Sequence, residues 1–258
     1  MDAGRNAHSF IGGRERRAGE RTSSAESAAH TERTATRVPR QTRVCNSIHP
    51  SAYDIDDVAA VLRSGGLVLI PSDTTYILAT MLLNNKQLSE GVAALFSLKK
   101  RKRHQAFPWI VKAPSDLEVF GCELSWDARQ IARHIWPAPV TLVVRASSAV
   151  PKVLTRPDQT IALRMSSHPF VAGILQACDS SLIVSSANQH LRTIPENFSQ
   201  ISPTIMQSAD IVYEGIPDAC QGISTIIDCT EGETRVVRHG CTPVARIEKA
   251  IGHRIASS

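Results

Sequence analysis

The feature that most constrains the fold lies in residues 67–103, where a short apolar run meets a polar turn. Residues 67–70 follow two glycines and are rich in branched side chains, which is typical of a buried β-strand. Pro71 has no backbone N–H to donate to a sheet, so we expect strand pairing to stop there. Residues 72–75 then place hydroxyls and one carboxylate at the end of the strand.

A cationic run follows this turn. We predict a helix over residues 87–98, with apolar residues on one face, and it ends in the five cationic residues 99–103. Because ligands of open α/β sheets bind beside strand ends, this pairing predicts a site for an anionic, phosphorylated substrate. Each half alone has a simpler explanation, since Ser, Asp and Thr often only stabilise turns and lysine runs are usually solvated.

The rest of the chain alternates predicted helices and strands. We expect helices over 54–63, 126–136, 168–178 and 245–251, and strands over 107–111, 140–145, 160–164, 182–185, 210–213, 223–229 and 234–238. Strands that alternate with helices, together with strands joined by short turns, indicate a single α/β domain. Its expected architecture is a twisted mixed β-sheet flanked by helices.

Residues 1–44 differ in composition from the rest. They hold nine arginines, no lysine and five acidic residues, a net of +4 out of +5, and almost no bulky apolar side chains. Such a segment cannot offset the entropy cost of ordering, so we expect a disordered Arg/Ser-rich tail over 1–44 and one domain over 45–258. Its acidic residues argue against an organelle transit peptide.

Composition also excludes several classes of protein. No stretch approaches the roughly 20 uninterrupted apolar residues of a membrane span. The six cysteines contain no C-x-x-C pair, which argues against a structural zinc. With no signal peptide predicted, we expect reduced thiols in a cytoplasmic protein.

Six short motifs occur between residues 67 and 240. Residues 71–76 read P-S-D-T-T-Y, 99–101 K-K-R, 136–141 W-P-A-P-V-T, 164–169 R-M-S-S-H-P, 186–188 S-A-N, and 224–228 S-T-I-I-D with 238–240 R-H-G. In this order they resemble the P-T-x-T-x-Y, K-x-R, W-P-G-P-x-T, R-x-P-x-H-P, S-A-N, and S-T-x-x-D with R-x-G signatures of the YrdC-like family of threonylcarbamoyl-AMP synthases. One match can arise by chance, but six in order are a strong signal.

The resemblance implies a nucleotidyltransferase. Such an enzyme makes threonylcarbamoyl-adenylate and pyrophosphate from L-threonine, bicarbonate or CO₂, and ATP. The adenylate is the activated intermediate for N6-threonylcarbamoyladenosine (t6A37) in tRNA, which implies a downstream tRNA threonylcarbamoyl transferase as partner. Catalysis would be mostly positioning and charge stabilisation. Mg²⁺ is implied with the triphosphate, and the sequence shows no metal-ligand cluster of its own.

The resemblance also implies site residues. The expected catalytic residues are Lys99 and Arg101, which match the phosphate-binding K-x-R. Positions matching ATP contacts are Arg101, Thr141, Ser186, Asn188 and Arg238, and positions matching L-threonine contacts are Thr74, Arg145 and Ser224. From the residues themselves, Thr141 and Arg145 lie at even spacing on one predicted strand and so point to one face. Without the resemblance, Ser186 and Asn188 would be expected to cap the next element, and Arg238 to be a solvated charge.

The sequence departs from the family pattern at three glycines. Ile77, Ala138 and Leu191 stand where the family has glycine, which removes conformational freedom or close backbone approach. A second interpretation is therefore a catalytically weak YrdC-like module that binds RNA (tRNA) or nucleotide through residues 99–103. A third, the carbamoyl-adenylate domain of hydrogenase-maturation proteins, is disfavoured because the chain has no zinc-finger cysteines.

Overall fold

The computed structural model of the protein describes residues 42–83, 88–100, 106–217 and 222–257. Helices in this part are α2 (Ala52–Arg63), α3 (Glu90–Leu98), α4 (Asp116–Phe120), α5 (Trp126–His134), α6 (Pro169–Cys178), α7 (Pro203–Ser208) and α8 (Val244–Ile251), with 3-10 turns η2 (Lys152–Leu154) and η3 (Phe198–Gln200). Strands are β1 (Thr42–Val44), β2 (Val68–Pro71), β3 (Tyr76–Thr80), β4 (Trp109–Ile110), β5 (Gly121–Cys122), β6 (Val140–Ala146), β7 (Thr160–Arg164), β8 (Leu182–Ser186), β9 (Ile211–Glu214), β10 (Thr225–Asp228), β11 (Arg235–Arg238) and β12 (Ala256–Ser257).

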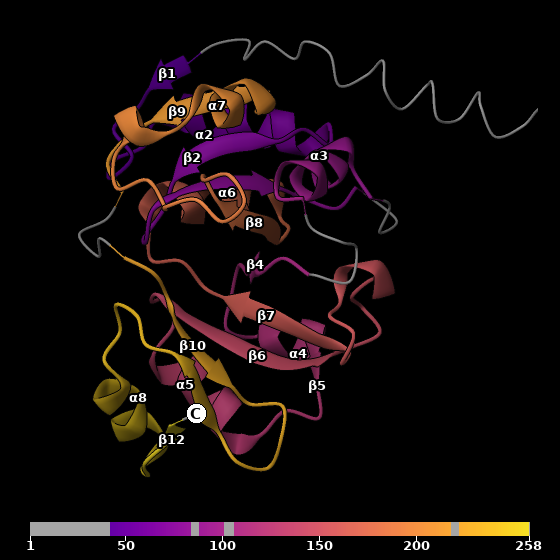
Figure 1. Cartoon of the computed structure of the whole chain (residues 1–258), viewed down its shortest axis with the longest axis vertical. Helices are drawn as coiled ribbons and strands as arrows, with labels where there is room; N and C mark the ends of the chain where they lie inside the picture. The colour runs from indigo at the N-terminus through magenta and orange to yellow at the C-terminus, as the bar shows by residue number, and fades with distance from the viewer. Residues whose placement is uncertain (1–41, 84–87, 101–105, 218–221, 258) are drawn as a thin grey trace, which may run out of the picture. The chain divides into compact units, whose positions relative to one another are not determined.

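All twelve strands found in the described ranges belong to one mixed sheet. Its order is β1-β9-β2-β3-β8-β4-β7-β6-β10-β11-β12, and β5 pairs with the end of β6 (Figure 1). Along β2, Val68 and Ile70 pack with α2 and α6, whereas the alternate residue Leu69 packs with the cluster that includes α3, α5 and α8. Helices therefore cover both faces of the sheet. This arrangement confirms the predicted α/β fold class.

The first hairpin differs from expectation. Pro71 is the last residue of β2 and lies opposite Tyr76, the first residue of β3. On its other side β2 pairs with β9 only through Val68 and Leu69, so the missing N–H of Pro71 interrupts no bond there. Pairing of β2 ends at Pro71, as expected, but β3 occupies a segment that the sequence pattern did not mark as a strand.

The predicted helices and later strands are confirmed, with bounds that shift by a few residues. Helix α2 begins after Ser51, whose hydroxyl accepts a hydrogen bond from the backbone N–H of Asp54, and it ends before Gly65 at φ +84°. The sequence analysis missed the short elements α4, α7, β5 and β12, which are too brief to show a periodicity. In the described ranges, no helix is long and apolar enough to cross a membrane.

Two expectations for the chain ends and cysteines need correction. The domain begins earlier than residue 45, because Thr42–Val44 form β1 and pair in parallel with β9; residues 1–41 lie outside the described ranges. Cys241 is disulfide-bonded, which contradicts the expectation of reduced thiols, because thiol pairing depends on which residues the fold brings together. Four cysteines are free, at positions 45, 122, 178 and 229, and Cys220 lies outside the described ranges.

The segment that follows α8 is held by a histidine–carboxylate contact. His253 Nε2 lies 2.9 Å from Asp127 Oδ1, and Asp127 Oδ2 accepts a hydrogen bond of 2.6 Å from Thr234 Oγ1. The bond to Asp127 raises the pKa of His253. Protonated His253 therefore stabilises the folded state below its unfolded pKa of about 6.5, and this contribution is lost as the pH rises through the raised folded pKa.

We expect the His253→Gln variant to melt at a lower temperature than the unmodified protein at about pH 5.5, below the unfolded pKa. The difference should shrink on the alkaline side of the raised folded pKa, because His253 is then neutral in both states. Circular dichroism melts over this pH range measure both quantities. A difference that stays constant with pH would contradict the role of His253 protonation.

Candidate functional site

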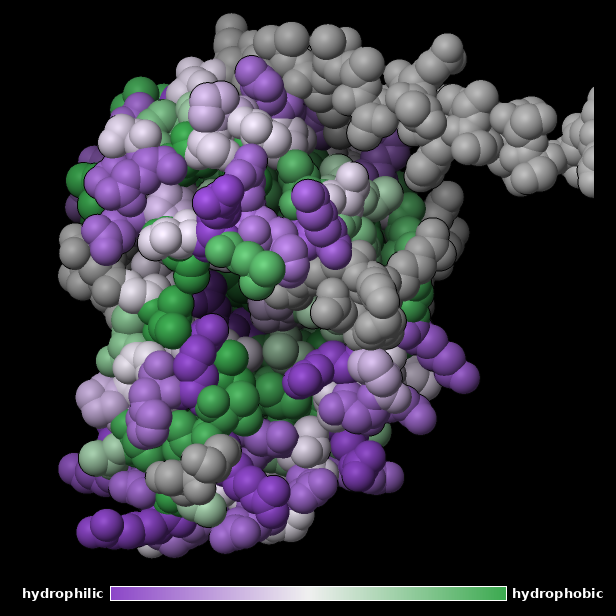
Figure 2. Space-filling view, in the orientation of Figure 1, coloured by the Kyte–Doolittle hydropathy of each residue, from purple (hydrophilic) through white to green (hydrophobic). Residues whose placement is uncertain are grey.

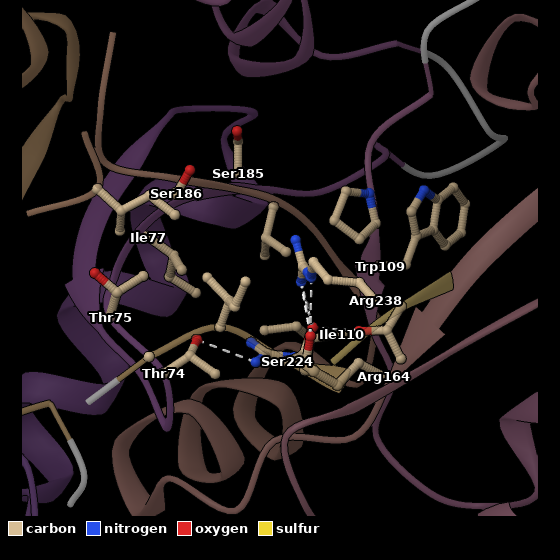
Figure 3. A pocket seen from close by; sticks show the side chains of 16 residues that line it. Thr74, Thr75, Ile77, Trp109, Ile110, Arg164, Ser185, Ser186, Ser224 and Arg238 are labelled. Atoms are coloured by element: carbon tan, nitrogen blue, oxygen red, sulfur yellow. Dashed lines mark hydrogen bonds between the residues drawn. The ribbon is translucent and has the colours of Figure 1, made fainter. Parts of the chain in front are cut away.

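A cavity of about 180 Å³ lies where the turn between β2 and β3 meets the ends of β4, β7 and β8. Its polar lining is Thr74, Thr75, Thr141, Arg164, Ser185, Ser186, Ser224 and Arg238, and its other lining residues are Ile77, Pro108, Trp109, Ile110, Val184, Ile194, Gly222 and Ile223 (Figure 3). Figure 2 shows the surface hollowed in this region, with hydrophilic side chains inside the hollow. The cavity is thus lined by hydroxyl and guanidinium groups together with aliphatic side chains.

A second cavity of about 150 Å³ adjoins the first. The two share Thr74, Thr75, Ile194, Gly222 and Ile223, and the second adds Pro195, Glu196 and Pro217. A ligand that fills both would contact the turn between β2 and β3 along its length.

Strand register brings the polar lining together. Arg164 lies opposite Ile110 on β4 and opposite Thr141 on β6, so these three side chains share one face of the sheet. Ser224 immediately precedes β10, which pairs with β6, and Arg238 ends β11, which pairs with β10. Residues far apart in sequence therefore meet on one side of the central strands.

The turn itself is partly structural. Ser72 Oγ donates a hydrogen bond of 2.6 Å to the Thr75 carbonyl, and Thr75 Oγ1 donates one of 2.7 Å to the Pro195 carbonyl. These bonds hold the turn closed, which is the usual role of such hydroxyls. Thr74, between them, lines the cavity, and its Oγ1 lies 3.3 Å from Ser72 Oγ.

Arg164 is a buried guanidinium held by this turn. Its Nη1 lies 3.3 Å from Asp73 Oδ1 and donates a hydrogen bond of 3.1 Å to Thr74 Oγ1 (Figure 3). Asp73 Oδ1 also accepts a bond of 2.7 Å from Ser166 Oγ, whereas Asp73 Oδ2 is buried without a hydrogen-bond partner in the described part of the chain. Asp73 thus balances the charge of Arg164 and fixes its position.

Arg238 is half-buried and has neutral partners. Its Nε and Nη2 donate to the Ser224 carbonyl at 3.1 and 2.8 Å, and Nη2 also reaches Ser224 Oγ at 3.1 Å. Ser224 Oγ in turn lies 2.8 Å from Thr141 Oγ1. Burial, and after it the positive charge of Arg164, lowers the pKa of Arg238. In the described part of the chain Asp73 pairs with Arg164, so the Arg238 guanidinium adds a positive charge to the cavity that attracts anions.

Lys99 joins two of the motifs. It follows α3, is only 4% exposed, and its Nζ donates to the Ser186 carbonyl at 2.6 Å and to the carbonyl and Oδ1 of Asn188 at 2.5 and 2.7 Å. Ser186 Oγ also donates to Asn188 Oδ1 at 2.6 Å. Lys99 therefore holds the turn that follows β8, and a direct contact with a phosphate would have to replace one of these bonds.

The structure brings most of the predicted site residues together. Thr74, Thr141, Ser186, Ser224 and Arg238 line the first cavity, and Lys99 and Asn188 adjoin it through the turn after β8. Arg101 lies outside the described ranges. The ligands assigned to these residues stay predictions.

Arg145 is not brought to the cavity. It lies on β6 four residues beyond Thr141, which at about 3.4 Å per residue separates the two by roughly 14 Å. Its Nε is 3.4 Å from Glu123 Oε2, and its side chain is 47% exposed. Even spacing predicts a shared face but says nothing of distance along the strand, and this is why the expectation placed Arg145 too near.

Arg164 occupies the place that the sequence analysis gave to Arg145. Arg164 begins the R-M-S-S-H-P motif, and the sequence analysis predicts no ligand contact for it. The available signal was its position at the end of a predicted strand, beside the strand that begins at the Thr141 motif. Pairing of these two strands would have placed Arg164 next to Thr141, but pairing is not visible in the sequence.

The three lost glycines have different consequences. Ile77 lines the first cavity, so its side chain takes up space there. Ala138 is buried, and its N–H donates to the Met165 carbonyl at 3.1 Å. Leu191 is exposed and adopts φ 59°, the left-handed conformation that glycine favours. The backbone path at residue 191 is therefore one that suits the family's glycine.

Metal-ligating groups are sparse. Within the described ranges, no group of three or more His, Cys, Asp or Glu residues could hold a metal ion.

Comparison with known proteins places the chain in a family. The family model Sua5/YciO/YrdC, described as telomere recombination, matches residues 60–240. Threonylcarbamoyl-AMP synthase from Pyrococcus abyssi is 28% identical over 200 residues, which are 78% of this chain but 58% of that protein. Threonylcarbamoyl-AMP synthase from Coxiella burnetii is 32% identical over 137 residues, 52% of this chain and 70% of that protein. The chain thus spans less than two thirds of its Pyrococcus relative.

Solved structures agree with this placement. The crystal structure of P. abyssi Sua5 complexed with L-threonine matches with a TM-score of 0.74 and 26% identity, over 84% of this chain and 62% of that one. E. coli YciO matches with a TM-score of 0.70 over 79% of this chain and 97% of that one, and at 19% identity this likeness shows the fold alone. Because the family model covers well over half of its length, the chain belongs to the Sua5/YciO/YrdC family.

Proposed function

We propose that the protein is a threonylcarbamoyl-AMP synthase, which forms threonylcarbamoyl-adenylate and pyrophosphate from L-threonine, bicarbonate or CO₂, and ATP. The observation that carries the proposal is the cavity lined by several hydroxyl groups and by two guanidinium groups, that of Arg164, which pairs with Asp73, and that of Arg238. Such a lining suits a ligand with several anionic oxygens. The names of the Pyrococcus and Coxiella relatives support the same reaction.

The chemistry asks little acid–base catalysis of the protein. The threonine nitrogen bonds to the carbon of CO₂, and the amine releases a proton to give a carbamate. A carbamate oxygen then attacks the α-phosphorus of ATP in line, and the bond from that phosphorus to the bridging oxygen breaks, releasing pyrophosphate. The protein would hold the two substrates in contact and offset negative charge with its guanidinium groups.

Within this proposal, each part of the cavity has a task. Thr74 and Ser224 would hold L-threonine, with Arg164 in the place expected of Arg145. Thr141, Ser186 and Arg238 would contact the nucleotide. Arg101, two residues after Lys99 in the sequence, would contact it as well. Mg²⁺ would arrive as part of the substrate MgATP. The t6A37 pathway, the tRNA threonylcarbamoyl transferase that receives the adenylate, and a cytoplasmic location belong to the same proposal.

The binding-module alternative receives no support from Lys99. A general polyanion patch needs solvent-exposed charges, whereas Lys99 is buried and its ammonium group donates hydrogen bonds to Ser186 and Asn188. Residues 101–103, the rest of the cationic run, lie outside the described ranges.

We expect L-threonine and bicarbonate to strengthen nucleotide binding by about fivefold or more, because ligands in adjoining cavities complete each other's contacts. Calorimetry with the α,β-methylene analogue of ATP measures this coupling without turnover. Serine should strengthen it less, since a pocket shaped around the threonine methyl loses about 1 kcal/mol or more without that group.

Pyrophosphate release from ATP, with and without L-threonine, completes the test. Release that depends on threonine supports the synthase. The synthase proposal would be abandoned if threonine affected neither quantity while RNA bound with a steep dependence on salt, as expected of a polyanion-binding module.

A further inference from the structure

Residues 215–217 follow β9, and Pro217 lines the second cavity, which Thr74 also lines. The side chain of Ile216 is 70% exposed, although it is large and apolar. Burial of this side chain therefore cannot hold the segment in place. Hydrogen bonds to its backbone therefore help to hold the segment in place.

Three buried side chains supply those bonds. Ser47 Oγ donates to the Ile216 carbonyl at 2.9 Å and accepts from the Ile216 N–H at 3.0 Å. His168 Nε2 lies 3.1 Å from the same carbonyl. The Tyr76 hydroxyl contacts the Gly215 carbonyl and accepts from the Gly215 N–H at 3.3 Å. Of these groups, Ser47 alone bonds both the donor and the acceptor of Ile216.

The approach of Ser47 to this segment is close. A Cβ atom added at Gly215 would lie 2.8 Å from Ser47 Cβ and 3.0 Å from Pro71 Cγ, so the site has no room for a side chain. Because Ser47 packs closely on Gly215, the Ser47 hydroxyl lies within hydrogen-bond distance of both the backbone N–H and the carbonyl of Ile216. The segment is thus located by contact as well as by hydrogen bonds.

Ser47 comes from a part of the chain outside the family match, which begins at residue 60. The strand that precedes it, β1, pairs in parallel with β9, and the N–H of Cys45 continues this pairing to the Glu214 carbonyl at 2.9 Å. Residues 42–47 therefore run beside residues 212–216 and bring the Ser47 hydroxyl to the end of β9.

We infer that Ser47 is a positioning residue for the candidate site: its hydroxyl fixes residue 216 and thereby the cavity wall at Pro217, next to Thr74. The identity of the affected substrate rests on the proposed function, in which Thr74 holds L-threonine. Loss of the Ser47 hydroxyl removes the acceptor of the Ile216 N–H, but the bonds from His168 and Tyr76 remain. The segment should loosen without unfolding of the domain.

The test compares Ser47→Ala with Tyr76→Phe and with Ser51→Ala. Tyr76→Phe removes a second hydroxyl that holds the same segment. Ser51→Ala is the matched control, because it also deletes one hydroxyl that bonds a backbone N–H, that of Asp54 at the start of α2, and has no bond to residues 215–217. Each variant is characterised by its melting temperature, by KM for L-threonine and kcat in pyrophosphate release, and by the exchange rate of the Ile216 amide.

We expect Ser47→Ala to raise KM for L-threonine about fivefold to tenfold, with kcat within about twofold, and to speed exchange of the Ile216 amide by about tenfold. Tyr76→Phe should shift KM in the same direction, and Ser51→Ala should change only the melting temperature. An equal KM for Ser47→Ala and Ser51→Ala, or an unchanged Ile216 exchange rate, would overturn the inference. If the unmodified protein releases no pyrophosphate, the proposed function fails, and amide exchange with calorimetry of L-threonine binding then decides the role of Ser47.

Discussion

Replacing Arg164 by alanine should lower the free energy of unfolding by about 3–5 kcal/mol, the usual result of removing one partner of a buried ion pair. Both side chains of the pair are buried, and Arg164 Nη1 lies 3.3 Å from Asp73 Oδ1. Without the guanidinium, Asp73 keeps its hydrogen bond from Ser166 but loses the charge that balances it. Thr74 Oγ1 loses its donor as well. Urea unfolding of the variant measures the effect.

A double variant separates the charge from the packing. Asp73→Asn combined with Arg164→Ala removes the uncompensated carboxylate, so it should be more stable than Arg164→Ala alone while both remain less stable than the unmodified protein. If Arg164→Ala cost less than about 1 kcal/mol, or if the double variant were the less stable of the two, the pair would not be the electrostatic support of this turn.

Replacing Lys99 by alanine should lower kcat/KM for pyrophosphate formation by about 100-fold or more. The reason is geometric, because the Lys99 ammonium holds two carbonyls and one side-chain oxygen of residues 186 and 188, and Ser186 lines the cavity. The variant also removes the Lys99 donor from the buried carbonyls of Ser186 and Asn188, whereas Asn188 Oδ1 keeps its bond from Ser186 Oγ. We therefore expect a loss of stability too, which the sequence alone did not indicate for a residue at a polar helix end.

Lys100 offers the matched control, since it is the next residue, has the same charge and is exposed. Lys100→Ala should leave kcat/KM within about twofold and the melting temperature nearly unchanged. Steady-state pyrophosphate release and thermal unfolding of both variants decide the matter. Near-normal turnover by Lys99→Ala would remove this residue from the candidate site.

Much of the fold follows from local patterns. The predicted strand over 160–164 coincides with β7, and the predicted helix over 54–63 differs from α2 only by an earlier start. Both segments carry a regular spacing of apolar residues and clear ends, so nearby residues suffice to define them. The order of these elements and of the six motifs likewise needs no distant contact to be seen.

The hairpin strand β3 shows where local pattern fails. All five of its residues are buried, so neither face is polar and the sequence shows no alternation. Its identity as a strand depends on pairing with β2 on one side and β8 on the other. The pairing with β8 joins residues about a hundred positions apart, which no short window of the sequence contains.

The site divides in the same way. The sequence by itself, through the family resemblance of its motifs, indicated that Thr74, Thr141, Ser186, Ser224 and Arg238 belong to one site, and these residues line one cavity. It also assigned Arg145 to that site, which the structure does not. Only the tertiary structure decided that Arg164, and not Arg145, lies beside Thr141, and that Ser47 holds residue 216 next to Pro217, which lines the second cavity. Strand register places Arg164 beside Thr141, and hydrogen bonds between residues far apart in the sequence link Ser47 to Ile216. Both depend on how the whole sheet packs between its helices.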